Sequence, residues 1–192
     1  MNLLLENIAK HVELTVEEQE LVMQLFLYEE YKAKTILLKP GEIANFTYFV
    51  IDGMLRSYTV DTNGTEHVLS FAAPNWFVSD MYSLISGKPA QQYISVINDF
   101  KGYKISRENQ EKLYKDVPKM ERFFRILIEN SVVAHQQRLI DNLSLTAEDR
   151  YEKFCKKYPD FIQCIPQKHI ASFIGVTPEF FSKMKARLLK SK

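Results

Sequence analysis

Between residues 165 and 189, polar and basic side chains recur at intervals that would place several of them on one face of a helix. Lysine can donate to guanine or to phosphate, glutamate can accept from the cytosine amine, and serine can contact either kind of group. These residue types predict recognition of double-stranded DNA, with no catalytic residue among them. The residues that we assign to DNA contact are Gln167, Lys168, His169, Thr177, Pro178, Glu179, Ser182, Lys183, Lys185 and Arg187.

Two short helices joined by a tight turn would present these side chains. The first helix is expected over Gln167–Ile174, and Gly175 can adopt the left-handed conformation that ends it. Thr177 can cap the second helix, whose first position suits a proline. Ala171 must be small, because the second helix presses against it. The pattern indicates a helix-turn-helix, whose second helix enters the major groove with its N-terminal half. Its inner apolar residues would be Ile170, Ile174, Phe181 and Met184.

The charge distribution favours the same interpretation. The chain of 192 residues has a net charge of +1. From Ile165 to the end, however, six basic residues and one acidic residue give a charge of +5, so the rest of the chain carries −4. A basic C-terminal segment in an otherwise slightly acidic chain favours a polyanionic partner for that segment. The sequence leaves no room for a β-hairpin wing after the second helix, so any wing is expected around Tyr158–Ile165.

The first half of the chain predicts a β-barrel preceded by a helix. The helix is expected over Leu14–Glu30, with Thr15 and Glu18 as its capping box. Short β-branched and aromatic segments then alternate with turn residues, which is typical of a sandwich, jelly roll or barrel. Asn63-Gly64 favours a type I′ hairpin turn with positive φ at both positions. A short helix is expected over Val78–Ser86. The expected strands are Thr35–Leu38, Thr47–Ile51, Met54–Val60, His67–Phe71, Tyr93–Ile97 and Lys101–Ile105.

A long helix is expected to join the two halves, over Lys119–Leu143, after a short one over Arg107–Tyr114. Its apolar stripe is broad enough to pack on the barrel on one side and on a twin helix of a second subunit on the other. Thr146–Asp149 predicts a capping box that begins a further helix through Lys157. We therefore expect a sensor domain over 1–118, a dimerisation helix and hinge over 119–145, and a DNA-binding domain over 146–192. The stripe consists of Met120, Phe123, Phe124, Leu127, Ile128, Val132, Leu139 and Leu143.

From Leu14 to Lys190 the chain resembles the Crp/Fnr family of bacterial transcription regulators, especially its short members. The resemblance implies an α+β fold: an N-terminal cyclic-nucleotide-binding-type β-roll (a double-stranded β-helix or jelly roll), a long dimerising helix, and a C-terminal winged helix-turn-helix. It also implies a homodimer on a palindromic site, an effector, and RNA polymerase as a further partner. The motifs that carry it are Lys39–Glu42, Tyr48–Arg56, Asp61–Glu66, Ala147–Tyr151 and Ile170–Glu179.

The sequence departs from the family pattern at the effector pocket. In nucleotide-binding members, the resemblance implies a Gly-Glu pair that opens a phosphate-cradling helix, and a downstream arginine that neutralises the phosphate. Ser79-Asp80 stands in place of the pair, and Gln91 or Gln92 in place of the arginine. Glutamine cannot supply the charge-assisted bidentate contact, so we expect an unknown small molecule or no ligand rather than a cyclic nucleotide. The pocket residues that the resemblance carries over are Ser79, Asp80, Met81, Gln91, Gln92, His135 and Gln136.

Other functional classes find less support. Cys155 and Cys164 form no metal-binding pattern, so neither an iron–sulfur cluster nor any other cofactor is identified. A cupin-like enzyme would need histidines clustered around a metal, and the four histidines are scattered. It therefore ranks below the main alternative, a small-ligand-binding barrel whose helix-turn-helix contacts protein. No apolar run approaches the roughly 20 residues of a membrane helix, and no signal peptide is recognised, so we expect a cytoplasmic protein. The histidines are His11, His67, His135 and His169.

Overall fold

The computed structural model describes residues 2–159 and 162–190, without the side chains of residues 189 and 190. Its contacts divide the chain into two compact units. The first combines Met1–Ser57 with Phe71–Val132, and the second combines Tyr58–Ser70 with Val133–Lys192. The long helix therefore contributes to both units. A β-hairpin segment from the first half of the chain belongs to the C-terminal unit, which the expected division into consecutive segments did not include.

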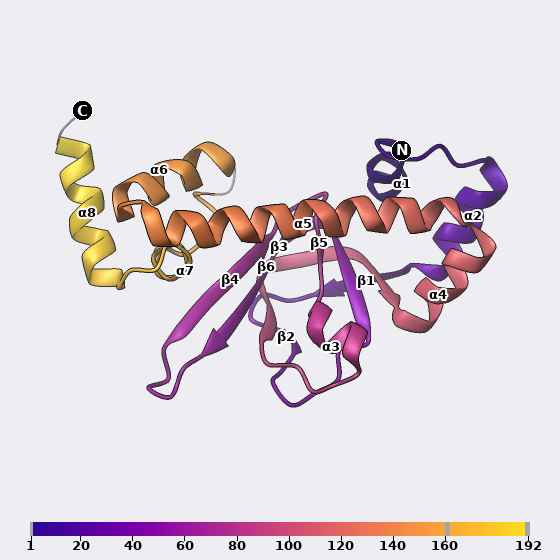
Figure 1. Cartoon of the computed structure of the whole chain (residues 1–192), viewed down its shortest axis with the longest axis horizontal. Helices are drawn as coiled ribbons and strands as arrows, with labels where there is room; N and C mark the ends of the chain where they lie inside the picture. The colour runs from indigo at the N-terminus through magenta and orange to yellow at the C-terminus, as the bar shows by residue number, and fades with distance from the viewer. Residues whose placement is uncertain (1, 160–161, 191–192) are drawn as a thin grey trace. The chain divides into compact units, whose positions relative to one another are not determined.

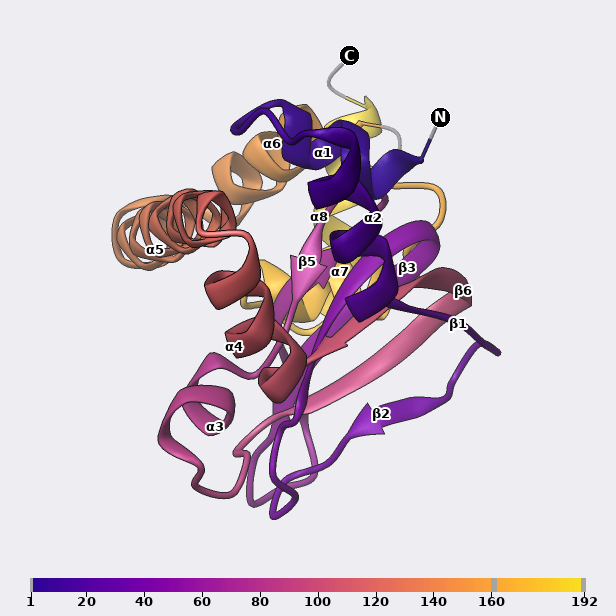
Figure 2. The same ribbon diagram turned by 90° about the vertical axis from the view of Figure 1, so that its right-hand side faces the viewer.

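The strands form one sheet in the order β1-β6-β3-β4, in which β2 also pairs with β6 and β5 with β3. Figure 2 shows β1 beside β6. Strand β1 pairs antiparallel with β6 along its whole length, from Leu27 opposite Lys104 to Tyr31 opposite Phe100. The strands are β1 (Leu27–Tyr31), β2 (Ile36–Leu38), β3 (Phe46–Val60), β4 (Glu66–Ala72), β5 (Phe77–Val78) and β6 (Tyr93–Ser106). This sheet with its helices confirms the expected α+β class.

Strands β3 and β6 are each continuous where two strands were expected: β3 runs through Asp52-Gly53, where the sequence predicts a turn, and β6 runs through residues 98–100. Gly53 in β3 has a φ of +82°, and a Cβ atom there would lie 2.1 Å from the carbonyl oxygen of Asp99 in β6. Glycine is therefore required by the close approach of the neighbouring strand and not by a chain reversal. Glycine occurs both in turns and where two backbones approach closely, which explains why the prediction of a turn at Gly53 was wrong.

The expected hairpin between β3 and β4 forms, but its turn is not type I′. Among the described residues only Lys34 and Asn75 combine a side chain with positive φ, so Asn63 does not. The Asp61 carboxylate instead accepts from the backbone N–H groups of Asn63 at 2.9 Å and Thr65 at 3.0 Å. An aspartate that bonds its own turn in this way stabilises a different loop geometry.

Among the described residues, five helices contribute to the first unit or begin in it. The expected N-terminal helix is too long: α2 has the predicted Thr15–Glu18 capping box but ends at Leu25, and the next residues form β1. Pairing with β6 overrides the helical tendency of this segment, since propensity is a weak constraint compared with tertiary contacts. The long helix extends to residue 144. These helices are α1 (Leu3–Ala9), α2 (Val16–Leu25), α3 (Met81–Ser86), α4 (Arg107–Asp116) and α5 (Lys119–Ser144), with α6 (Ala147–Lys157) following in the second unit.

The first unit has two apolar clusters. One joins the N-terminal helices, α4 and the start of α5 to the sheet residues Phe49 and Ile105. In it, the ring of Phe77 lies 5.8 Å from that of Phe123 and 5.9 Å from that of Phe124. The other consists largely of sheet residues, among them Val50, Ile94 and Phe100. The first cluster holds the first turns of α5 against the sheet, as the expected stripe predicted for Met120, Phe123 and Phe124.

The C-terminal helices α6, α7 (Gln167–Phe173) and α8 (Pro178–Lys190) follow α5 in the orange-to-yellow part of Figure 1. The predicted capping box of α6 forms: Thr146 accepts from the Asp149 backbone and Asp149 accepts from the Thr146 backbone. Of the segment where a wing was expected, residues 160 and 161 lie outside the described residues. Its described part contains Tyr158, the C-cap residue of α6, and turn or bend residues at 159 and 162–165, without a strand.

Candidate nucleic-acid interface

Helices α7 and α8 meet at the tight turn that the sequence predicted. Gly175 has a φ of +76°, and the N–H of Val176 donates to the carbonyl of Ala171 at 3.0 Å. The Thr177 hydroxyl accepts from the N–H of Phe180 at 3.2 Å, and Pro178 is the first residue of α8. The cap, the proline and the glycine therefore occupy the positions that a helix-turn-helix requires.

The inner faces of the two helices are buried together. Ala171 has no exposed surface, which agrees with the requirement for a small residue there. The ring of Phe181 on α8 contacts Tyr151 on α6 edge to face, with centroids 5.1 Å apart. Burial raises the pKa of Tyr151 to about 12, so its hydroxyl stays protonated at neutral pH. The buried apolar residues of the motif are Ile170, Ala171, Ile174, Phe181 and Met184.

Arg150 fastens the turn to the preceding helix, and sequence reasoning did not assign it this role. Its Nε donates to the carbonyl of Ile174 at 2.8 Å and its guanidinium donates to the carbonyl of Leu145 at 2.6 Å. Carbonyls at helix ends lack partners within the helix, and Arg150 supplies one at each of two ends. The sequence offered one signal, a charged residue beside the aromatic Tyr151, which does not identify an acceptor 24 residues away.

Most of the side chains assigned to DNA contact are exposed. Lys185 is half-buried, and Arg187 forms an ion pair with Glu148 on α6. The Ser182 hydroxyl donates to the carbonyl of Pro178 at 2.9 Å but lies on the exposed side of α8. The outer side of α8 therefore carries hydroxyl, carboxylate and ammonium groups above an apolar inner side. The exposed residues are Gln167, Lys168, Thr177, Pro178, Glu179, Ser182, Lys183 and Arg187.

His169 differs from the other residues of this set. Only 8% of its surface is exposed, and its Nδ1 lies 3.9 Å from the Glu66 carboxylate on β4. A buried imidazole facing a carboxylate has no route to a DNA phosphate in this arrangement. We therefore leave His169 out of the proposed contact set; the sequence placed it correctly at the start of α7 but could not show which way it points.

The segment expected to bind an effector phosphate uses its polar groups internally. Asp80 is 2% exposed, and its carboxylate accepts from the N–H of Ser83 at 3.0 Å as the N-cap of α3. Ser79 donates to the carbonyl of Phe46 at 3.0 Å. Ser83 donates to the carbonyl of Lys88 at 2.7 Å, which closes the loop after α3. These contacts use the side chains of Ser79, Asp80 and Ser83 to stabilise the loop itself, so these residues do not fit a cyclic phosphate.

The remaining effector candidates lie in different surroundings. Met81 and Gln91 are exposed and Gln92 is half-buried, all in the first unit. His135 and Gln136 are exposed on α5 in the second unit. The structure therefore brings Ser79, Asp80 and Met81 together at the start of α3.

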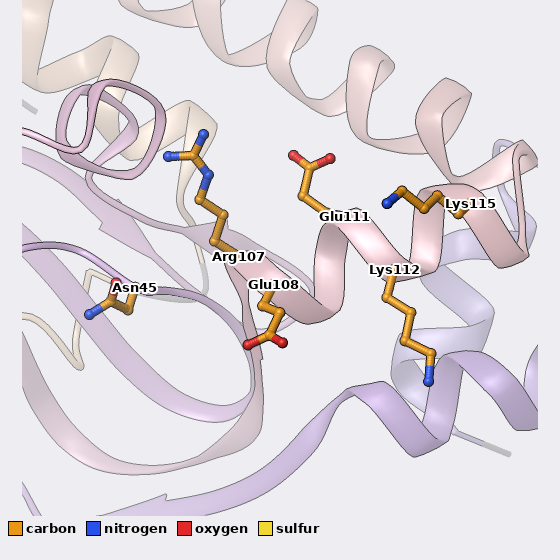
Figure 3. Close-up of a pocket in the computed structure, with 6 residues that line it drawn as sticks. All are labelled: Asn45, Arg107, Glu108, Glu111, Lys112 and Lys115. Carbon is orange, nitrogen blue, oxygen red and sulfur yellow. The ribbon is translucent and has the colours of Figure 1, made fainter.

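A shallow charged hollow lies beside α4 in the first unit, lined by residues that sequence analysis did not single out (Figure 3). Its acidic and basic side chains point in different directions along α4. Arg107 is engaged with the end of α3, since it donates to the carbonyls of Leu84 at 2.5 Å and Ile85 at 3.2 Å. Diverging charges of both signs do not define a ligand, and we assign none.

Comparison with known proteins relates the chain to transcription regulators. The family described as Cyclic nucleotide-binding domain matches residues 28–116. The Anaerobic regulatory protein of Haemophilus influenzae is 23% identical over 190 residues, covering 92% of this chain and 73% of that protein. The Fumarate and nitrate reduction regulatory protein of Vibrio cholerae is 21% identical and covers 81% of this chain and 66% of that protein.

Solved structures extend the likeness across the sensor and the helix-turn-helix. The c-di-GMP responsive global regulator CLP of Xanthomonas campestris has a TM-score of 0.75 at 17% identity, covering 92% of this chain and 93% of that chain. FixK2 from Bradyrhizobium japonicum has a TM-score of 0.76 at 18% identity, covering 86% and 85%. These comparisons relate the chain to the Crp/Fnr family of transcription regulators.

This relation gives the exposed face of α8 a context. Crp/Fnr regulators bind DNA and function as dimers, and the relatives found for this chain are regulators rather than enzymes. Within the described residues, no helix combines the length and apolar character needed to cross a bilayer. The comparisons therefore agree with the sequence-based assignment of family and fold.

Proposed function

We propose that this chain is a homodimeric, sequence-specific DNA-binding transcription regulator that acts in the cytoplasm without catalysing a reaction. One observation supports the proposal most directly. Helix α8 buries Phe181 and Met184 on one side and exposes Glu179, Ser182 and Lys183 on the other. A recognition helix needs this division, because one side must pack on its own domain while the other reaches base edges.

Each exposed residue has a specific expected role in this proposal. Lys183 would donate to guanine or to phosphate, and Glu179 would accept from a cytosine amine. Ser182 would contact a base or a phosphate. At the start of α7, Gln167 and Lys168 would meet the DNA backbone, where helix N-termini favour negative charge. Phosphate contacts would orient the domain, and the base contacts of α8 would supply sequence preference.

The dimer would form along α5, whose described surface carries exposed apolar residues. Leu139 is 60% exposed and Leu143 is 81% exposed. Together with Ile128 and Val132 they follow the chain in steps of four, seven and four residues, so all four lie on one face of the helix. A two-stranded coiled coil buries such a face. Pairing would also present two recognition helices to a palindromic site.

The effector is proposed to be something other than a cyclic nucleotide, or to be absent. Asp80 serves as a helix cap, and glutamines stand where a phosphate-binding arginine is required. A different small molecule would contact the start of α3 together with Gln91 or Gln92. His135 and Gln136 are further candidates for contact with an effector. RNA polymerase is the protein partner that a regulator of this kind would contact.

The decisive experiment is selection of bound sequences from a random duplex library, with and without cyclic AMP. We expect an enriched palindrome whose recovery does not depend on the nucleotide. Binding to that palindrome should weaken steeply as salt rises, because phosphate contacts release counterions. The alternative, a helix-turn-helix that contacts protein, predicts a different result. No DNA sequence would then be enriched in either condition, and protein partners would retain the chain to an extent that does not depend on salt. Enrichment only with cyclic AMP would overturn the proposal on the effector.

A further inference from the structure

The hairpin segment Tyr58–Ser70 contacts the first helix of the helix-turn-helix within the second unit. The hydroxyl of Ser172 on α7 accepts from the N–H of Val68 at 2.9 Å and donates to the carbonyl of Glu66 at 2.6 Å. One side chain therefore satisfies both a donor and an acceptor of β4, as a neighbouring strand would. Serine suits this position because a hydroxyl has one donor hydrogen and also accepts.

Arg138 of the long helix bonds to the same hairpin. Its guanidinium donates to the carbonyl of Val68 at 2.8 Å and to the carbonyl of Leu69. It also donates to the carbonyl of Phe173, at the end of α7, at 2.9 Å. The guanidinium carbon lies 4.1 Å from the centroid of the Phe173 ring. Arg138 thus contacts two segments that are more than a hundred residues apart in the sequence.

The arginine is partly shielded from water at this junction. Removal from water lowers the pKa of Arg138, but an arginine remains charged at neutral pH. Charge-assisted hydrogen bonds are stronger than neutral ones and gain further where water is excluded. A lysine could supply one such donor but not the planar fork that reaches three carbonyls.

From these contacts we infer that Arg138 and Ser172 are positioning residues for DNA reading: they fix α7 to the hairpin and to the long helix, and so set the angle at which each recognition helix meets its half-site. The inference rests on the proposed DNA-binding function. In the arrangement that they hold, Lys183 and its neighbours on α8 are exposed. The contacts therefore favour binding. A dimer whose two heads have one fixed orientation should accept only a narrow range of half-site spacings.

The test uses the full chain and its selected palindrome. Arg138→Met retains most of the aliphatic stem and removes the donors, and Ser172→Ala removes one hydroxyl. Matched controls are Arg125→Met, on the same helix in an exposed pair with Glu129, and Ser144→Ala, whose hydroxyl bonds only within its own helix turn in the described contacts. Each variant is measured on the palindrome, on a single half-site, and on palindromes with inserted or deleted base pairs. Thermal unfolding and light scattering report folding and dimerisation.

Arg138→Met should lower affinity for the palindrome about tenfold or more, because hydrogen bonds to a charged group are each worth roughly this factor. Binding to the single half-site should stay within about twofold, and the altered spacings should bind nearly as well as the original one. Ser172→Ala should change the spacing preference in the same direction. This second variant keeps the inference testable if Arg138→Met does not fold. Equal losses on half-site and palindrome would indicate a merely structural role and overturn the inference. Unchanged or tighter binding to the palindrome, with unchanged spacing preference, would also overturn it. A wild-type chain that selects no palindrome would instead contradict the proposed function.

Discussion

The Nε of Arg150 lies 2.8 Å from the carbonyl oxygen of Ile174, the residue before the turn between α7 and α8. This bond ties α6 to the point at which the chain changes direction. Arg150→Met should lower the free energy of unfolding by about 2 kcal/mol, because it leaves two carbonyls without their charged partner. Denaturant unfolding measures the change, and Arg125→Met is the control, since its exposed ion pair contributes little. A variant as stable as the wild type would show that solvent replaces Arg150.

Gly175 provides a second test of the turn. Its φ of +76° is a conformation that residues with a Cβ atom adopt at a cost of roughly 1–2 kcal/mol. Gly175→Ala should therefore destabilise the C-terminal helices by about that amount. Gly175→Asn should lose less, because asparagine tolerates this region. Thermal unfolding of the two variants compares them directly, and an alanine variant with the wild-type melting temperature would contradict the assigned backbone strain.

Lys183→Ala tests the proposed readout by α8. If the ammonium contacts a base, affinity for the selected palindrome should fall about tenfold and the preference at one position should relax. If it contacts phosphate, affinity should fall similarly for all sequences. The slope of log affinity against log salt concentration should then become shallower by about one unit. Competition binding at several salt concentrations separates the two results. The exposed Lys112 on α4 is the control. Unchanged affinity and preference would remove Lys183 from the contact set.

Leu139→Glu tests the dimer. The residue is exposed in the single chain, so the substitution should leave folding intact. A glutamate in the seam of a coiled coil should separate the subunits at micromolar concentration, because the charge would lose its hydration on pairing. Light scattering gives the mass. The control is Asn130→Glu, an exposed position on the opposite face of α5. A dimer of unchanged stability in the Leu139 variant would place the subunit contact elsewhere.

The Asp141–Lys153 pair predicts a specific dependence on pH. The hydrogen bond from Lys153, 2.8 Å away, is the main cause that holds the pKa of Asp141 below its ordinary value. A lowered pKa means that the pair stabilises the fold above the unfolded-state pKa, about 3.9 for aspartate, and that this contribution is lost as pH falls through the folded-state value. Asp141→Asn should therefore be less stable than the wild type at pH 7, with the difference vanishing in acid. Unfolding across pH, with Lys153→Gln as the partner variant, checks this; a difference that does not shrink as the pH falls through the acid range would contradict the assignment.

Local sequence signals determined the helix-turn-helix and its caps. Thr146 with Asp149, Gly175, and Thr177 before Pro178 act within a few residues of themselves, so their meaning survives without knowledge of the fold. The small Ala171 and the apolar Phe181 follow from helical periodicity. The order of the motifs then extended the resemblance from these elements to the whole chain. This was enough to predict the family resemblance and the face of α8 that is proposed to meet DNA.

Tertiary structure decided what depends on a distant partner. The segment after Leu25 becomes a strand because β6 is available to pair with it. Gly53 continues a strand because the backbone of Asp99 lies against it. His169 is buried against β4, and Arg138 and Ser172 bond to carbonyl or N–H groups of a hairpin about seventy to a hundred residues away. Every residue offers the same backbone groups, so no side-chain pattern marks which carbonyl an arginine will reach, and only the folded chain brings the two together.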